Sequence, residues 1–286
     1  MLPHSRQFDA IGTKWRIETN TPLTPVVAAS ISACIESFDH TYSRFRSDSL
    51  VGQAARQAGT YHFPDDSVAL FKFYRTLYDL TDGQVTPLIG AMLERAGYDA
   101  SYSLSPNKQS PLPTWDEAMI WQHTTLTTMQ PVVIDVGAAG KGYLVDKISH
   151  ILDAAEVSDY VVDASGDIRH RGKQENIVGL ENPFNTSEVI GSISVQNESL
   201  CASATNRRTW GKGLHHIFDP RTMLPTQEIV ATWVIAKEGL LADGIATALF
   251  FVTPERLLET FKFEYVRMHY NGSLEYSLRF KEGLFV

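Results

Sequence analysis

The sequence has few of the features that mark secreted, membrane-spanning or nucleic-acid-binding proteins. Its 286 residues include only two cysteines, too few for a disulfide framework. Lysine and arginine number 25 against 33 aspartates and glutamates, and the net charge of −8 argues against binding to nucleic-acid phosphates. The apolar run at residues 240–252 is too short to cross a bilayer and contains Asp243.

A signal for export is also missing from the first residues. Residues 1–15 have no apolar core of the kind found in signal peptides and no cysteine that could carry a lipid. We therefore expect a cytoplasmic protein with no membrane insertion. Its 43% hydrophobic and 20% charged residues are ordinary for a globular protein, and the length suffices for one large domain or two smaller ones.

Helices dominate the predicted first half. After a strand expected over residues 10–18, Thr24 and Pro25 resemble an N-cap followed by proline at the first helical position. The helix that follows carries an apolar stripe from Ile31 to Phe45, and a second amphipathic helix covers residues 70–78. Residues 101–114 are rich in serine, proline and asparagine, which predicts a surface loop.

Strands dominate the predicted second half. Alternating or continuous apolar patterns predict five of them, over residues 160–163, 189–195, 229–236, 264–269 and 273–280. Many antiparallel-looking strands with a few long helices favour an α+β fold over a doubly wound sheet. No convincing linker interrupts the chain, so we expect a single domain over residues 1–286.

A glycine-rich segment, DVGAAGKGY at residues 135–143, is the most informative stretch. It follows the apolar run 131–134, interpreted as a strand, and leads into an amphipathic helix. A strand, a glycine turn and a helix start can present amide groups to an anion, and Lys141 would add a formal charge. A tight turn whose glycines only permit close packing is the alternative. The P-loop pattern fails, because Gly142 and Tyr143 follow Lys141 where serine or threonine is needed.

Asp243 and Thr247 lie four residues apart on a predicted helix, so their side chains share a face. Their apolar surroundings imply burial, and a buried aspartate needs a partner, for which a hard cation is a good candidate. Taken alone, the pair is explained better by an aspartate that caps the first helical turn, with Thr247 simply packed.

The segment HHIFDPRTMLP, residues 215–225, combines two histidines with two prolines in a stiff, turn-rich stretch. Such a loop can present a histidine as a base. Zinc is disfavoured because adjacent histidines point apart and no third ligand stands at zinc spacing. An ordinary structural turn is the alternative, and Asp167, after Gly166, is likewise interpreted as structural.

Taken in order, these segments resemble the ApbE family, flavin transferases that move FMN from FAD onto a protein threonine. Residues 10–15 (AIGTKW), 43–49 (SRFRSDS) and 81–88 (TDGQVTPL) are similar to its MGT-W, serine-aspartate-serine and T-GAFDP elements. Residues 135–146 (DVGAAGKGYLVD) resemble DLGGIAKGYAVD, and residues 163–168 (DASGDI) the N-GGDI turn. Residues 215–222 (HHIFDPRT) resemble HHI-DPRTG, and residues 242–250 (ADGIATALF) resemble AD-LATALF. The similarity runs nearly from end to end.

The resemblance implies an ApbE-like fold of two T-fold-like halves, with antiparallel sheets, packed helices, internal pseudo-duplication and a flavin site between the halves. It implies that Asp243, Thr247 and the carbonyl of Ala138 hold Mg²⁺, and that His216 is the base that deprotonates the acceptor hydroxyl. The residues it implies as FAD contacts are Ile11, Phe45, Gln84, Val85, Thr86, Asp135, Lys141 and Ile217.

The activity implied is Mg²⁺-dependent transfer of FMN from the substrate FAD to a threonine of an acceptor protein, with release of AMP. Two alternatives stay open: an FAD pyrophosphatase that uses water as the nucleophile, and an FAD-binding protein without turnover. The sequence departs from the family pattern at Met223, in place of a glycine, and at residues 84–86, which replace AFD. These positions bear on flavin-ring contacts and on the choice of acceptor.

Overall fold

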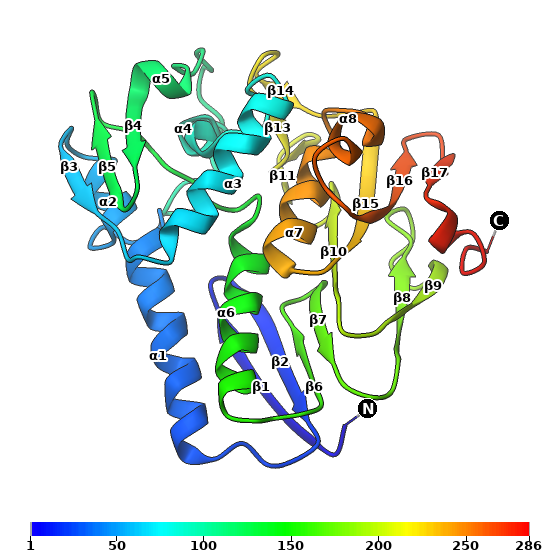
Figure 1. Cartoon of the computed structure of the whole chain (residues 1–286). Coiled ribbons are helices and arrows are strands. Elements are labelled where there is room, and N and C mark those ends of the chain that lie inside the picture. Colours follow the sequence, from blue (N-terminus) through cyan, green and yellow to red (C-terminus); the bar gives the residue numbers. More distant parts are fainter. Residues whose placement is uncertain (1, 286) are drawn as a thin grey trace. The chain divides into compact units, whose positions relative to one another are not determined.

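The computed structural model describes residues 2–285 and divides into two compact units (Figure 1). The first unit combines the chain up to Glu36 with Ala139–Asn206 and the residues from Glu228 onward. The second unit comprises Ser37–Ala138 and Arg207–Gln227. Helix α1 (Pro25–Tyr42) begins in the first unit and ends in the second.

The first unit is built on an eight-stranded antiparallel sheet of order β1-β2-β6-β7-β10-β15-β16-β17. Its strands are β1 (His4–Ala10), β2 (Thr13–Thr19), β6 (Tyr160–Asp163), β7 (Asp167–Arg171), β10 (Ser199–Ala204), β15 (Ile229–Ala236), β16 (Glu264–His269) and β17 (Leu274–Tyr276). A separate hairpin pairs β8 (Asn176–Glu181) with β9 (Val189–Val195).

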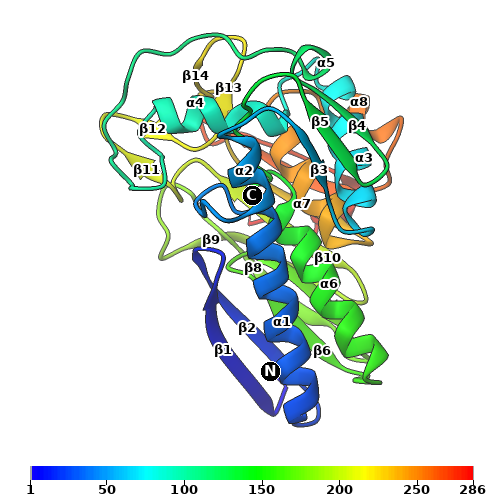
Figure 2. The ribbon, with the colours of Figure 1, turned by 90° about the vertical axis from the view of Figure 1, so that its left-hand side faces the viewer.

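Helices α6 (Gly140–Ala154) and α7 (Gly239–Ala248) pack against each other and against this sheet. Figures 1 and 2 show α6 and the first turns of α1 running side by side. The unit also contains α8 (Pro254–Leu258) and the 3₁₀ helix η2 (Leu278–Phe280).

The core of the first unit explains the continuous apolar character of β15. Ala231, Trp233 and Ile235 lie in a cluster with residues of the β8–β9 hairpin and Phe280. The strand's other face meets α7, where the Thr232 hydroxyl donates to the Ala246 carbonyl. A strand covered on both faces has no solvent side, so its sequence shows no polar alternation.

The second unit is built from short elements around aromatic side chains. Phe71 of α3 stacks on Trp121 of the three-stranded sheet β3-β5-β4. The elements are α2 (Leu50–Ala54), β3 (Thr60–His62), α3 (Ser67–Leu80), η1 (Pro87–Ile89), α4 (Gly90–Arg95), α5 (Trp115–Ala118), β4 (Met119–Gln122), β5 (Thr125–Thr128), β11 (Thr209–Trp210), β12 (Leu214–His215), β13 (Phe218–Asp219) and β14 (Leu224–Pro225).

Three sequence-based assignments are wrong in detail. The strand expected over residues 10–18 begins only at Thr13, as β2, because Ile11 and Gly12 both have positive φ, at 44° and 75°, and turn the chain after β1 ends at Ala10. Residues 131–134 are not a strand, since Val132 N–H donates to the carbonyl of Ala54 at the end of α2 rather than to a neighbouring strand. Of residues 273–280, only Leu274–Tyr276 is a strand, because the chain then coils into η2.

The α+β class is confirmed, as are the strands at Tyr160–Asp163, Val189–Val195, Ile229–Ala236 and Glu264–His269. Helix α1 starts at Pro25, where the Thr24 hydroxyl accepts a bond from Val27 N–H at 3.3 Å. Among residues 2–285, no helix is both long and apolar enough to span a bilayer. Internal pseudo-duplication of a single domain stays a prediction.

Candidate functional site

The residues predicted to form the site fall into two groups, one in each unit. Ile11, Lys141, Asp243 and Thr247 belong to the first unit. The second unit holds Phe45, Gln84, Val85, Thr86, Asp135, Ala138, His216 and Ile217.

In the first unit, α6 and α7 meet at two glycines. A Cβ added to Gly142 would lie 2.1 Å from the Gly239 carbonyl oxygen, and one added to Gly239 would lie 2.6 Å from the Gly142 carbonyl oxygen. Both distances are far inside van der Waals contact, so the two helix backbones touch with no side chain between them. The glycines of the segment 135–143 therefore serve close packing, at least at Gly142.

Each of these two helices is capped by an aspartate of the other. Asp243 on α7 accepts a 2.9 Å hydrogen bond from Gly142 N–H in the first turn of α6. Asp146 on α6 accepts bonds from Gly239 N–H at 2.7 Å and Leu240 N–H at 2.8 Å, at the start of α7. These N–H groups have no acceptor within their own helix. The capping role considered for Asp243 is therefore present, but across two helices.

Lys141 is held by Asp167, the first residue of β7. Its Nζ pairs with the Asp167 carboxylate, which is completely buried, while the lysine side chain is 21% exposed. Burial raises the pKa of the nearby Cys201 thiol well above its ordinary value, and Asp167 and Asp243 raise it further while Lys141 lowers it. The thiol is therefore protonated at neutral pH. The structural role of Asp167 stays a prediction.

In the second unit, Asp135 is bound by a residue that sequence analysis did not single out. Arg44 Nε donates to Asp135 Oδ2 at 2.6 Å, and Gly137 N–H donates to Oδ1 at 2.6 Å. Burial raises the pKa of Asp135, but the charge and hydrogen bond of Arg44 and the Gly137 amide lower it more, so the net pKa is below the ordinary value. Asp135 is therefore ionised at neutral pH.

The same arginine fixes the aromatic wall predicted at Phe45. Its guanidinium carbon lies 4.1 Å from the Phe45 ring centroid and 5.0 Å from that of Tyr98. Phe45 stacks on Tyr102, with centroids 5.6 Å apart and planes 9° apart. Arg44 is buried, so one cation orients both the carboxylate of Asp135 and the ring of Phe45.

The segments 81–88 and 215–222 meet through one hydrogen bond. Gln84 Nε2 donates to Asp219 Oδ2 at 3.1 Å, and Arg221 N–H donates to Asp219 Oδ1 at 2.8 Å. Thr86 caps η1, because its hydroxyl accepts from Leu88 N–H at 3.2 Å. Threonine thus performs a cap that an aspartate at this position would also provide. Val85 is buried and contributes to packing.

His216 follows a histidine with a different role. His215 is buried; its Nε2 donates to the Thr226 carbonyl at 2.9 Å and its Nδ1 accepts from Ile217 N–H at 3.2 Å. Burial lowers the pKa of His215, which favours this neutral tautomer. Ile217 is also buried, whereas His216 is half-buried. The pair therefore divides into a structural histidine and one with access to solvent.

The ribbon that carries His216 is anchored to α4. The indole N–H of Trp210 donates to the Ala96 carbonyl at 2.7 Å, and its ring stacks on Tyr98 with centroids 5.6 Å apart. Phe218 lies in the same apolar cluster as Met92 and Leu93. The position of His216 in its unit is thus set by aromatic packing on both sides of it in the sequence.

The donor groups fit a hard cation better than a soft one. Within residues 2–285, no three His, Cys, Asp or Glu side chains group as metal ligands. Asp243 is 3% exposed and Thr247 follows it by one helical turn, half-buried. A buried carboxylate with a hydroxyl on the same helix face offers oxygen donors of the kind that Mg²⁺ prefers.

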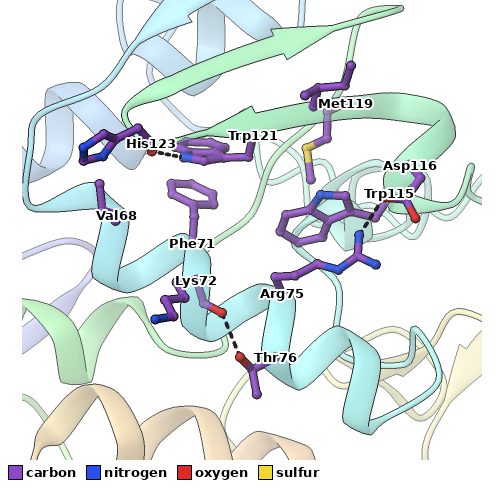
Figure 3. Close-up of a pocket in the computed structure, with 11 residues that line it drawn as sticks. Val68, Phe71, Lys72, Arg75, Thr76, Trp115, Asp116, Met119, Trp121 and His123 are labelled. Carbon is purple, nitrogen blue, oxygen red and sulfur yellow. Dashed lines mark hydrogen bonds and ion pairs between the residues drawn. The ribbon is translucent and has the colours of Figure 1, made fainter.

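A pocket of about 520 Å³ in the second unit is lined by none of the predicted site residues. Figure 3 shows Trp121 over Phe71 on one side and Trp115 beside Arg75 on the other. The Arg75 guanidinium is paired with Asp116 at 2.6 Å and with Asp79 at 3.0 Å. Its charge is therefore neutralised within the unit.

Comparison with known proteins identifies the family to which this chain belongs. The model of the ApbE family matches residues 11–268. A Rhodobacter capsulatus protein named FAD:protein FMN transferase is 29% identical over 212 residues, which cover 68% of this chain and 40% of that protein. A Treponema pallidum protein of the same name is 26% identical, over 88% of this chain and 80% of that protein.

The fold has close counterparts among solved structures. An ApbE protein from Thermotoga maritima superposes with a TM-score of 0.85 at 22% identity, over 99% of both chains. The flavin transferase ApbE from Vibrio cholerae gives a TM-score of 0.79 at 18% identity, over 98% of this chain and 99% of that chain. The chain spans less than two thirds of the length of several curated relatives that it matches, among them one from Haemophilus influenzae of which it covers 59%.

Proposed function

Because the chain belongs to the ApbE family, we propose that it transfers FMN from FAD to a threonine of an acceptor protein and releases AMP. The observation that carries this proposal is the α6–α7 crossing. There, Gly142 N–H donates a hydrogen bond to Asp243, the only acidic side chain of α7. Lys141 precedes Gly142 in the sequence, so it lies in the first turn of α6 beside the residue that binds this carboxylate. A cation and an oxygen donor for a metal are thus linked at one helix start, as a pyrophosphate substrate requires.

Asp243, Thr247 and the carbonyl of Ala138 would hold the Mg²⁺ that this reaction needs. Bound there, the ion would supply neutralisation of the charge that develops on the pyrophosphate oxygens. The support for this assignment is the chemistry of the donors, a buried carboxylate and a half-buried hydroxyl on one helix face.

Lys141 would contribute a second positive charge to a phosphate oxygen. Its partner Asp167 is buried and fixed on β7, so the ammonium group is positioned, while a fifth of the side chain is exposed. In the second unit, Phe45, Asp135 and residues 84–86 would contact the flavin portion, with Arg44 holding the first two in place.

The group transfer exchanges one P–O bond for another. The acceptor threonine oxygen would attack the phosphorus of the FMN portion, the bond from this phosphorus to the AMP oxygen would break, and AMP would leave. His216 would remove the proton of the threonine hydroxyl, since it is the half-buried member of the histidine pair and its neighbour is fixed in a structural role. The expected cytoplasmic location stays a prediction.

The test is an assay with defined products. The purified protein is incubated with FAD and Mg²⁺, with and without a flavin-accepting domain, and AMP, free FMN and the acceptor's mass are measured. Release of AMP together with a gain of FMN mass on the acceptor, lost when the acceptor threonine is changed to alanine, supports the transferase. Equal amounts of FMN and AMP without acceptor indicate the pyrophosphatase, and FAD binding without products indicates a passive binder.

A further inference from the structure

Asp146 touches the start of α7 but belongs to none of the groups assigned above to metal, FAD or proton transfer. We infer that Asp146 is a positioning residue that seats α7 on α6 and thereby fixes where the Asp243 carboxylate stands. This inference rests on the proposed function only in so far as Asp243 is the metal-binding carboxylate.

The first argument is that α7 has no cap of its own. Glu238 occupies the N-cap position, but its side chain makes no capping hydrogen bond. The two oxygens of Asp146 bind the first two amides of the helix instead, Gly239 N–H at 2.7 Å and Leu240 N–H at 2.8 Å. A carboxylate bound to two amides at once fixes both the position and the rotation of the helix end.

The second argument is that α6 also has no side-chain cap of its own and is capped by a residue of α7. Ala139 is its N-cap residue and has no side chain able to cap. Asp243 accepts from Gly142 N–H at 2.9 Å, and so ties α7 back to α6 at a point one turn beyond Gly239. Two anchors one turn apart define the seating of α7, and Asp146 is the one that is not itself assigned to the metal.

The third argument is that α6 and α7 are packed so closely that neither helix can shift without moving the other. A Cβ on Gly142 would approach Asp243 Cβ to 2.7 Å, and a Cβ on Gly239 would approach Asp146 Oδ1 to 3.1 Å. Gly142 thus lies against Asp243 and Gly239 against Asp146, and each glycine also lies against the other's helix. A change in the seating of α7 is therefore passed directly to Asp243, with no flexible side chain to absorb it.

The experiment measures cation binding separately from FAD binding. Mn²⁺ binding is titrated by electron paramagnetic resonance without FAD, and FAD binding is titrated by flavin fluorescence without divalent cation. We expect Asp146→Ala to weaken Mn²⁺ binding by roughly 10- to 100-fold, the usual cost of losing a partner that orients a ligand. Metal-free FAD affinity should change by less than about threefold.

Two further variants separate positioning from general destabilisation. Asp146→Asn keeps one oxygen that can accept from an α7 amide, so it should bind Mn²⁺ more tightly than Asp146→Ala and remains informative if the alanine variant does not fold. Gly239→Ala removes no carboxylate from the chain but forces the helices apart, and should weaken Mn²⁺ binding while leaving metal-free FAD binding intact.

The matched control is Asp153→Asn, on the same helix. Asp153 accepts from the Tyr160 hydroxyl at 2.9 Å and pairs with Arg171 at 2.8 Å, so its loss costs stability. Asp153 lies at the C-terminal end of α6, away from the Gly142 contact with α7, and its variant should leave Mn²⁺ affinity unchanged.

The outcomes separate this inference from the proposed function. Wild-type Mn²⁺ affinity in folded Asp146→Ala, together with loss of Mn²⁺ binding in Asp243→Ala, would overturn the positioning role alone. Unchanged Mn²⁺ binding in Asp243→Ala would overturn the metal site itself. Equal losses of Mn²⁺ and FAD binding in Asp146→Ala and in Asp153→Asn would reduce Asp146 to a residue that only stabilises the fold.

Discussion

The two units hold their key carboxylates by different means. In the first, Asp146 and Asp243 are held by backbone amides at the starts of two helices. In the second, Asp135 is held chiefly by the guanidinium of Arg44. Burial raises the pKa of Asp146 and its two amide partners do not offset this. For Asp135, Arg44 together with the Gly137 amide and Arg208 outweighs burial, and the pKa is lowered.

Because of this difference, the two kinds of carboxylate are sensitive to different mutations. A carboxylate held by amides depends on where two helices lie, so it is disturbed by any atom added at their contact. A carboxylate held by an arginine depends on one side chain and loses its stabilisation with that charge. The four predictions below test this contrast, beginning with the largest expected effect.

Removal of the α7 carboxylate should abolish cation-dependent turnover. Asp243→Asn keeps an oxygen for Gly142 N–H but loses the charge, so we expect less than about a tenth of wild-type AMP release at saturating Mg²⁺, a loss above ~1.4 kcal/mol. Its melting temperature should stay near that of the wild type. Asp243→Ala should lose activity equally and about 1–3 kcal/mol of stability besides, because the amide is left without an acceptor. More activity than this in the asparagine variant would sink the metal assignment.

The histidine pair offers the sharpest contrast within the second unit. His216→Ala should lower FMN transfer by roughly 10²–10⁴-fold and leave FAD affinity within a few fold. The fall in rate toward acid pH should disappear, because it reports protonation of this base. His215→Ala should instead lower the free energy of unfolding by about 1–3 kcal/mol and keep the acid limb. Loss of FAD affinity with a normal rate per bound FAD would make His216 a binding residue.

Lys141 can be separated from its buried partner. Lys141→Met should weaken FAD binding by about 1.5–3 kcal/mol, the worth of a hydrogen bond to a charged group, and leave riboflavin binding unchanged because riboflavin has no phosphate. It should also destabilise the fold, since Asp167 is left buried without its cation.

The double variant Lys141→Met, Asp167→Asn distinguishes the two effects. It should regain stability, because no buried charge is left unpaired, but should not regain FAD affinity. Calorimetric titration with both ligands decides the matter. Equal losses for FAD and riboflavin would contradict a contact with phosphate.

Arg44→Met should have the smallest effect and the clearest pH dependence. The folded-state pKa of Asp135 is lowered, so its ion pair contributes stability above the pKa of the unfolded chain, and this contribution disappears as pH falls through the folded-state pKa. In the variant, burial is opposed only by weaker influences, the Gly137 amide and the charge of Arg208, and the pKa of Asp135 should rise. Urea unfolding between about pH 7 and pH 3 should show a gap between the two proteins that narrows toward acid pH. A gap of constant size would mean that Arg44 acts through packing on Phe45 alone.

The sequence predicted elements well where local pattern and tertiary environment agree. The strand Val189–Val195 alternates because one face is buried, and Ile229–Ala236 is continuous because both faces are. The prediction failed where local chemistry gave no signal. Ile11 adopts a positive φ that β-branched residues rarely accept, so nothing before Gly12 marked the turn.

The site shows the same limit. The order of the sequence motifs identified the candidate residues in both units, but whether these residues bind Mg²⁺ and FAD stays a prediction. Arg44 was missed because its partner Asp135 is 91 residues away, and an arginine in a loop, between Ser43 and Phe45, shows no periodicity. The hydroxyl-to-amide cap at Thr86 was visible in principle, since threonine before proline is a known helix start. Asp146 was noted only as a match to the motif, because its role depends on a helix that begins 93 residues later.

The exchange of caps between α6 and α7 has a consequence for how the first unit folds. Asp243 and Gly142 are 101 residues apart, and Asp146 and Gly239 are 93 apart, so neither helix start is completed by its own neighbourhood. Closing so long a loop costs entropy before any bond forms, and the bonds then form together. The amides of Gly142, Gly239 and Leu240 should therefore exchange with solvent in one concerted opening, which makes this crossing a single cooperative element despite its distant parts.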